Sequence, residues 1–222
     1  MSATTSRICD RSACQILGDD LKRYYVGIFT VSAATLLLEL ALTRVLSVAM
    51  WYHFGFLVIS TALLGFGVAG VALSLWPGFR ERAPLDTTLS LLSLGFGATT
   101  FLSYWLTQKI VFDPFDVVAH RSQLLLAPLY YLIITIPFFF SGLVIALLFS
   151  RRSTEVNRLY AFDLLGAGIG CAGLALVMPA FGGAGSVLFA ALLGFVGAAV
   201  FGWSQEPGRS YWSPISGIFL SG

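Results

Sequence analysis

The chain has 222 residues, of which 57% are hydrophobic and 11% are charged, and its net charge is only +2. Soluble domains carry about 25% charged residues, so this composition excludes a water-soluble globular protein. The small net charge provides no electrostatic basis for binding nucleic acid.

Four long runs of the sequence contain no Asp, Glu, Lys or Arg. They cover residues 45–79, 87–108, 122–150 and 164–205. A bilayer core of about 30 Å requires about 20 apolar residues of helix, so each run is long enough to cross a membrane and the last is long enough for two crossings. The sequence therefore predicts an all-α, polytopic membrane protein.

The predicted layout is a cytoplasmic tail (1–23), a six-helix transmembrane domain (24–205) and a second cytoplasmic tail (206–222). The first tail has no apolar core typical of a cleavable signal peptide. A proline followed by clustered glycines at 179–185 is expected to separate the last two spans, and 77–86 is expected to form a polar turn. The six predicted spans are 25–46, 54–76, 88–105, 124–149, 159–178 and 185–203.

Lysine and arginine are divided unequally between the two sides of this layout. Only Lys109 and Arg121 lie in the odd-numbered connections, whereas ten others lie in the tails and the even-numbered connections. Cytoplasmic loops are enriched in these residues, so we expect both termini in the cytoplasm. The ten residues are Arg7, Arg11, Lys22, Arg23, Arg80, Arg82, Arg151, Arg152, Arg158 and Arg209.

The first span carries two charged residues within an apolar sequence, Glu39 and Arg44. Burying a charge at the centre of a membrane helix costs about 2.5–3.5 kcal/mol on insertion scales. Glu39 also belongs to a polar stripe at helical spacing, which predicts a face turned towards other helices. The stripe consists of Ser32, Thr35, Glu39, Thr43 and Ser47.

Two interpretations of these intramembrane groups remain open. One is a buried polar cluster near the outer leaflet with a structural role, in which Glu39 and Arg44 fix the arrangement of the first two helices. The other is a proton or ligand site, because an ionisable group inside a membrane is a functional candidate by default. We favour the structural interpretation, and the candidate site consists of Glu39, Thr43, Arg44 and Asp163. Asp163 is expected about one turn inside the cytoplasmic face, within reach of Arg152 and Arg158.

Glycines occur at spacings that predict close helix packing. Asp163, Gly166, Gly170 and Gly173 share one face of the fifth span, and the sixth span adds the pair Gly194 and Gly197. The sequence GFGVAG (65–70) matches the dinucleotide pattern G-x-G-x-x-G, but that fingerprint requires a preceding strand and a helix that begins within the motif. These glycines lie in the middle of an apolar span, so we interpret them as packing residues.

The outer segment FDPFDVVAHRSQ contains carboxylates and an imidazole at helical spacing. Carboxylate and imidazole ligands could hold a divalent metal, but an amphipathic surface helix shows the same pattern. The surface helix is the preferred interpretation. The metal candidates are His53, Asp113, Asp116 and His120.

Four motifs, in this order, resemble a known family. They are LELALTRVLSVAMWYHFGFLVISTALLGFG (38–67), RSQLLLAPLYYL (121–132), PFFFSGLVIAL (137–147) and RLYAFDLLGAGIG (158–170). Over about 24–205 the chain resembles the membrane half of spermidine-synthase-like bacterial proteins, in which a multi-helix domain is fused to a soluble Rossmann-type aminopropyltransferase or methyltransferase domain. Matching positions are Glu39, Thr43, Arg44, His53, Arg121, Gln123, Asp163 and Gly166.

The resemblance also implies what is missing. YWSPISGIF (211–219) resembles the entry into the soluble domain, yet the sequence ends at Gly222, so we expect a chain that is not an enzyme, with no catalytic residues and no assigned cofactor. We therefore favour a non-catalytic scaffold or accessory subunit, in contact with lipid and with other membrane subunits such as those of a respiratory or photosynthetic complex. The alternatives are a small transporter using Glu39 and Asp163, the membrane partner of a separately encoded spermidine-synthase-like enzyme, and a membrane enzyme or metal site on the outer face. The resemblance to a bacterial family implies that the protein lies in the bacterial inner membrane.

Overall fold

The computed structural model describes residues 11–50, 53–76, 84–109 and 121–203. All regular elements in these residues are helices, and no strand occurs among them. The elements are α1 (Arg11–Met50), α2 (His53–Leu75), α4 (Leu85–Lys109), α5 (Arg121–Arg151), the 3₁₀ turn η1 (Ser153–Glu155) and α6 (Val156–Gly202).

Five helices in the described part of the chain are long and apolar enough to cross a membrane. The all-α class predicted from the sequence is therefore confirmed, and the five helices are suited to a membrane protein, whereas the expected count of six spans is not reproduced. The difference lies in α6, because the predicted spans 159–178 and 185–203 both fall, apart from Trp203, within this one 47-residue helix. α1 also begins earlier than the predicted first span, at Arg11, although its apolar segment begins only at Leu21.

The backbone of α6 is interrupted at Gly182, inside the segment 179–185 where a break was expected. Gly182 has φ 70° and ψ −176°, a backbone conformation that residues other than glycine rarely adopt. Pro179 lies three residues earlier and has no N–H to donate to the helix. These two residues divide α6 into a first arm (156–181) and a second arm (183–202).

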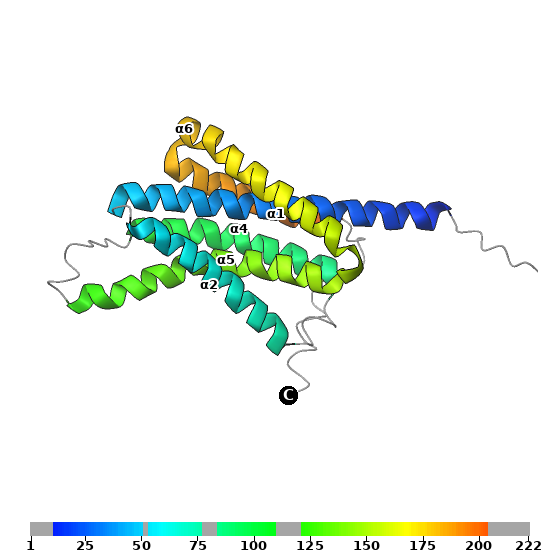
Figure 1. The fold of residues 1–222 in the computed structure, drawn as a ribbon, viewed down its shortest axis with the longest axis horizontal. Coiled ribbons are helices and arrows are strands. Elements are labelled where there is room, and N and C mark those ends of the chain that lie inside the picture. The colour runs from blue at the N-terminus through cyan, green and yellow to red at the C-terminus, as the bar shows by residue number, and fades with distance from the viewer. Residues whose placement is uncertain (1–10, 51–52, 77–83, 110–120, 204–222) are drawn as a thin grey trace, which may run out of the picture.

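The two arms run in opposite directions along α1. Gly166 and Gly170 of the first arm lie against the backbone of Phe29 and Ala33, so this arm is parallel to α1. In the second arm, Gly183 lies beside Val45 near the end of α1, whereas the ring of Phe201 lies against Gly27, which is 18 residues earlier in α1. The chain therefore reverses at the break, as the yellow and orange parts of α6 show in Figure 1.

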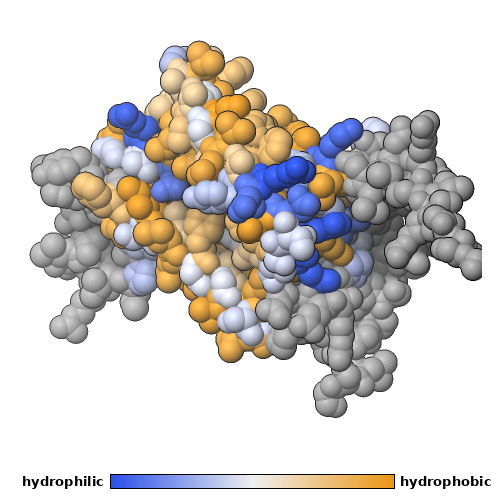
Figure 2. Space-filling view, turned by 45° about the vertical axis from the view of Figure 1, so that its right-hand side comes forward, coloured by the Kyte–Doolittle hydropathy of each residue, from blue (hydrophilic) through white to orange (hydrophobic). Residues whose placement is uncertain are grey.

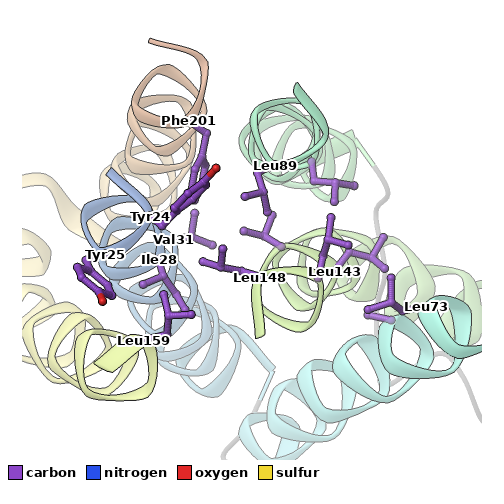
Figure 3. Close-up of a cluster of buried hydrophobic side chains, with 14 residues drawn as sticks. Tyr24, Tyr25, Ile28, Val31, Leu73, Leu89, Leu143, Leu148, Leu159 and Phe201 are labelled. Atoms are coloured by element: carbon purple, nitrogen blue, oxygen red, sulfur yellow. The ribbon is translucent and has the colours of Figure 1, made fainter. Parts of the chain in front are cut away.

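The remaining helices complete a bundle around α1. α6 makes the most extensive contact with α1, α4 packs between α6 and α5, and α2 packs mainly on α5, which it crosses obliquely in Figure 1. Two buried apolar clusters fill the interior. In the cluster drawn in Figure 3, Ile28 and Val31 of α1 face Leu89 of α4, Leu148 of α5 and Phe201 of α6.

The second cluster lies farther along the same helices. It joins Leu38 of α1, Phe96 of α4, Phe138 of α5 and Val187 of α6. Lipid tails are as apolar as these side chains, so the clusters hold the helices together by close van der Waals contact and not by removal of apolar surface from water.

Glycines bring α4 and the second arm of α6 together. A Cβ added to Gly97 would lie 2.9 Å from the carbonyl oxygen of Ala191, and one added to Gly194 would lie 3.0 Å from the Cα of Gly97. Ser90 of α4 uses this proximity to donate a hydrogen bond to the carbonyl of Ala198 at 2.8 Å. Small residues therefore allow helix backbones to approach, as the spacing of Gly194 indicates in the sequence.

The G-x-G-x-x-G pattern lies inside α2. Gly65 packs against the side chain of Phe138, with 2.7 Å between the position of an added Cβ and the Cβ of Phe138, whereas Gly67 and Gly70 have no neighbour within 4 Å. From the opposite side, Gly142 of α5 approaches Phe66. The first glycine of the pattern therefore serves the contact between α2 and α5, and no strand precedes it in the described residues.

The outer surface of the bundle is apolar over long stretches, as the orange area of Figure 2 shows. On α2 the exposed side chains include Phe56, Leu63, Val71 and Leu75, which are between 57% and 71% accessible. Monomeric soluble proteins rarely expose apolar patches of more than a few hundred Å², so a surface of this kind is suited to lipid or to other membrane helices.

Candidate functional site

Asp163 is held by a residue of the polar stripe on α1. Its Oδ1 accepts a hydrogen bond from the hydroxyl of Ser32, and both groups lie between α1 and the first arm of α6. The short serine side chain reaches across because Gly166, one turn farther along α6, lets the two backbones come into contact at Phe29. The carboxylate of Asp163 is therefore part of the α1–α6 interface.

The arginines expected beside Asp163 have other partners. Arg158 forms an ion pair with Glu155, with 3.8 Å between the nitrogen and the oxygen. The guanidinium of Arg152 lies over the ring of Tyr24, 4.7 Å from its centroid. The expected link between Asp163 and the fourth connection is thus replaced by a link to α1.

Glu39 and Arg44 lie on α1 without touching each other. Glu39 is partly buried and Arg44 is exposed, and in the described part of the chain neither side chain has a hydrogen bond or an ion pair. Thr43 donates to the main-chain carbonyl of Glu39 at 2.8 Å, so it does not engage the carboxylate. Glu39 lies seven residues, or about 10 Å along a helix, beyond Ser32, so it is also separated from Asp163.

The hydroxyls of the predicted stripe mostly bind their own helix. Thr35 donates to the carbonyl of Val31 at 2.8 Å, and Ser47 donates to the carbonyl of Thr43 at 2.6 Å. Ser32 and Thr35 are buried against neighbouring helices, as the stripe predicts, but only Ser32 forms a hydrogen bond to another helix. Back-bonding of this kind satisfies a hydroxyl without fixing a neighbour.

A polar cluster occurs at the opposite end of the bundle from Arg44, and the sequence interpretation considered two of its members, Arg152 and Arg158, only as partners of Asp163. Tyr24 donates to the Asp86 carboxylate at the start of α4, and Tyr25 donates to Oε2 of Glu155 in η1 at 3.1 Å. The ring of Tyr25 also stacks on Phe162, with centroids 4.9 Å apart. We call this group the basal cluster: Tyr24, Tyr25, Asp86, Arg152, Glu155 and Arg158.

The basal cluster joins α1, α4 and the turn between α5 and α6. A sequence signal for it existed in the Tyr-Tyr pair that follows Lys22 and Arg23, because aromatic and basic residues gather at membrane interfaces. The partners of the pair could not be found in this way, since Asp86 is 62 residues and Glu155 is 130 residues distant in the chain.

A cavity of about 190 Å³ lies between α1, α4, α5 and the second arm of α6. One wall is apolar and comes from α1, with Leu38, Leu42, Val45 and Leu46. Val187 contributes from α6, and Tyr130, Ile134 and Pro137 contribute from α5. The facing wall on α4 is polar and consists of Thr100, Ser103, Tyr104, Thr107 and Gln108.

A hydrogen bond between α4 and α5 supports this cavity. Pro137 has no N–H, so the carbonyl of Ile133, four residues earlier, lacks its usual partner within the helix. The hydroxyl of Ser103 donates to this carbonyl at 2.8 Å. The proline that interrupts the α5 ladder is thus compensated from α4, and both Ser103 and Pro137 face the cavity.

The sequence contains a signal for the polar wall. The polar positions 100, 103, 104, 107 and 108 recur at i, i+3, i+4, i+7 and i+8, which places them on one face of a helix. No described residue that lines the cavity is charged. The positions of charged residues in the sequence therefore do not indicate this site.

The predicted metal candidates cannot be assembled from the described residues. Asp113, Asp116 and His120 lie outside them, and His53 begins α2 at a position where only the backbone is described. Among the residues that the structure does describe, no group of three His, Cys, Asp or Glu side chains could hold a metal ion.

Comparison of the chain with protein-family models, with curated proteins and with solved structures finds no match. The resemblance to spermidine-synthase-like membrane domains therefore stays a prediction from four sequence motifs. Functional interpretation depends on the geometry of the bundle itself.

Proposed function

We propose that the chain crosses the bacterial inner membrane six times, with both ends in the cytoplasm. A straight 47-residue helix would be about 70 Å long, more than twice the hydrocarbon core, so the two antiparallel arms of α6 are suited to separate crossings. The basic residues near the basal cluster support a cytoplasmic position for that end. They are Lys22, Arg23, Arg151, Arg152 and Arg158. An epitope tag at Gly222 that is accessible only from the periplasm would refute this orientation.

We further propose that the protein is a non-catalytic scaffold or accessory subunit of a larger membrane complex. The observation that carries this proposal is the outer face of α2. Gly65, Gly142, Gly166 and Gly170 each meet a neighbouring helix, whereas Gly67 and Gly70 of α2 have no neighbour within 4 Å.

Glycine on a membrane helix permits the close approach of another helix. Where no helix approaches, glycine weakens packing because it has no side chain. Ser60 and Ser74 extend the same exposed face, and their hydroxyls are satisfied by their own helix through bonds of 3.1 and 2.8 Å to the carbonyls of Phe56 and Val71. The face therefore consists of small residues among apolar ones, and its hydroxyls are satisfied. Such a face is suited to contact with a helix of another subunit.

Purification from the native membrane in mild detergent tests this function. We expect co-purifying membrane subunits with the wild-type chain and their loss with Gly67→Leu. Gly168→Leu is the matched control, because Gly168 of α6 is also without a neighbour within 4 Å but lies on another helix. A clean monomer under all gentle conditions would contradict the scaffold function, and equal loss with both variants would contradict the use of α2.

A second candidate is a small transporter that uses Glu39 and Asp163. The observation in its favour is that the carboxylate of Glu39 has no partner among the described residues. This candidate requires that Glu39→Gln abolish proton- or substrate-coupled flux in liposomes while folding is retained. Flux that is unchanged in Glu39→Gln would contradict the transporter function.

The resemblance supports a third candidate, a membrane partner for a separately encoded spermidine-synthase-like enzyme. This candidate makes a specific prediction for the same purification experiment. A soluble aminopropyltransferase-like chain would accompany the protein in place of other membrane subunits.

A further inference from the structure

We infer that the cavity between α1, α4, α5 and α6 is a binding site for a small neutral ring that carries a carbonyl group. The site is separate from the α2 face and does not depend on the scaffold function. Its volume is about 190 Å³. An apolar protein cavity of about 150 Å³ holds benzene, so this one has room for a six-membered ring with one or two small substituents.

The lining indicates an uncharged ligand. The residues that line the cavity include no Asp, Glu, Lys or Arg, so no described group there could neutralise an ionic ligand. Burying an unpaired charge is far more costly than burying a hydrogen-bonded carbonyl. The apolar wall on α1 would contact the ring, and the polar wall on α4 would contact its substituent.

The hydrogen-bond inventory of the polar wall defines which substituent fits. The hydroxyl hydrogens of Thr100, Ser103 and Thr107 are already donated to the carbonyls of Phe96, Ile133 and Tyr104, at 2.7, 2.8 and 2.8 Å. These three groups can therefore only accept further hydrogen bonds.

Tyr104 and Gln108 are different. The phenol oxygen of Tyr104 accepts a hydrogen bond from Nε2 of Gln108 at 3.0 Å, which leaves the phenol hydrogen without an acceptor among the described residues. Gln108 is exposed and Tyr104 is half-buried, so this pair lies at the rim of the cavity, where the second amide hydrogen of Gln108 also has no acceptor among the described residues. Accepting a bond from Gln108 also polarises the phenol and strengthens it as a donor.

The cavity thus offers two adjacent donors, and a neutral acceptor satisfies them best. A carbonyl oxygen has two lone pairs and could accept from both Tyr104 and Gln108. The floor beneath them is buried and apolar, since Leu38, Ile134 and Val187 are 1%, 3% and 1% exposed. A ring would lie on this floor with its carbonyl directed towards α4.

The site is also preformed. Ser103 and the carbonyl of Ile133 fix the separation of α4 and α5 beside Pro137, so the polar wall does not need to move when a ligand enters. Pre-organisation of this kind reduces the conformational cost of binding. The ester carbonyl of a membrane lipid could satisfy the same two donors, but it carries no ring and would therefore compete with the proposed ligand for the site.

The experiment uses the full chain in nanodiscs, with its tyrosines replaced by 3-fluorotyrosine, and follows ¹⁹F resonances as acetophenone is added. We expect the Tyr104 resonance, assigned by its absence in Tyr104→Phe, to shift and saturate. The resonance of Tyr160, which is exposed on the first arm of α6 and does not line the cavity, is the control and should not change. α-Methylstyrene has the same shape without the carbonyl oxygen, and it should bind about fivefold more weakly because it cannot accept a hydrogen bond.

A variant that fills the floor provides the second test. Val187→Phe places extra volume in the cavity and should weaken binding by more than about tenfold, as a site of this size predicts. The shift of the Tyr104 resonance should then no longer saturate. If this variant binds acetophenone like the wild type, or if the ketone and the alkene bind equally, the inference is wrong.

Lipid composition distinguishes a ring from a lipid ester as the ligand. Nanodiscs of diether phosphatidylcholine contain no ester carbonyl, whereas diester nanodiscs do. Equal acetophenone binding in both kinds of nanodisc supports a ring as the ligand. Binding that is lost in diester nanodiscs contradicts it, because a lipid ester then occupies the site. Absence of a saturable shift in either kind of nanodisc overturns the site.

Discussion

The contact between α1 and the first arm of α6 leads to the sharpest prediction for the fold. A Cβ added to Gly170 would lie 2.9 Å from both the carbonyl carbon and the Cα of Ala33, and still closer to its oxygen. Ordinary carbon–carbon contact begins near 3.5 Å, so Gly170→Ala forces the helices apart by roughly 0.6 Å or more. The obstructing atoms are main chain and cannot rotate away.

The loss in free energy of unfolding expected for Gly170→Ala follows from comparison with a second glycine of the same arm. Gly168 has no neighbour within 4 Å, so the only expected effect of Gly168→Ala is a stabilisation of the helix by about 1 kcal/mol from the higher helix propensity of alanine. Gly170→Ala receives the same gain but adds overpacking, which costs about 1–3 kcal/mol. We therefore expect the free energy of unfolding of Gly170→Ala to be about 1–3 kcal/mol below that of Gly168→Ala.

Unfolding in mixed micelles of increasing SDS mole fraction, followed by circular dichroism, measures this difference. Gly166→Ala should behave like Gly170→Ala, because its added Cβ would meet the backbone of Phe29 in the same way. The double variant should cost less than the sum, since one displacement of α6 relieves both clashes. Equal stability of Gly168→Ala and Gly170→Ala would show that α1 and α6 are not in backbone contact.

Three further predictions concern interhelical hydrogen bonds, and the same SDS titration measures each of them. Ser32→Ala leaves the carboxyl of Asp163 without its donor and should destabilise the fold by about 1–3 kcal/mol, whereas Ser32→Thr should restore most of the loss. Ser103→Ala leaves the carbonyl of Ile133 unpaired and should cost a similar amount, and an unchanged midpoint would show that this hydrogen bond does not stabilise the contact between α4 and α5. Tyr24→Phe removes the phenol that donates to the α4 carboxylate and should cost about 1 kcal/mol, and an unchanged midpoint would indicate that the basal cluster does not stabilise the bundle.

The placement of the intramembrane charges shows where sequence interpretation reaches its limit. Helical spacing correctly places Ser32 and Thr35 on a buried face of α1, because periodicity reports which side of a helix is covered. Spacing cannot report what covers that face. Asp163 was therefore expected beside Arg152 and Arg158, although its observed partner is Ser32, 131 residues away in the chain.

The cavity illustrates the same limit for a binding site. Thr100, Ser103 and Tyr104 were visible as polar residues in an apolar span, yet their spacing alone is also that of a wet surface stripe. They become a cavity wall only because α1 lies opposite with Leu38 and its neighbours. The role of Ser103 depends further on Pro137, a residue of another helix.

The sequence by itself determined the class of this protein and the place where its last apolar run reverses. Uncharged runs of more than 20 residues are stable only in hydrocarbon, and proline with clustered glycine interrupts a helix wherever it occurs, so both features depend on local chemistry. The tertiary structure decided the partners: Ser32 for Asp163, Asp86 for Tyr24, and the four helices around the cavity. The physical reason is that lipid and protein are equally apolar, so the choice between helix faces depends on small residues and hydrogen bonds that meet only when the bundle is assembled.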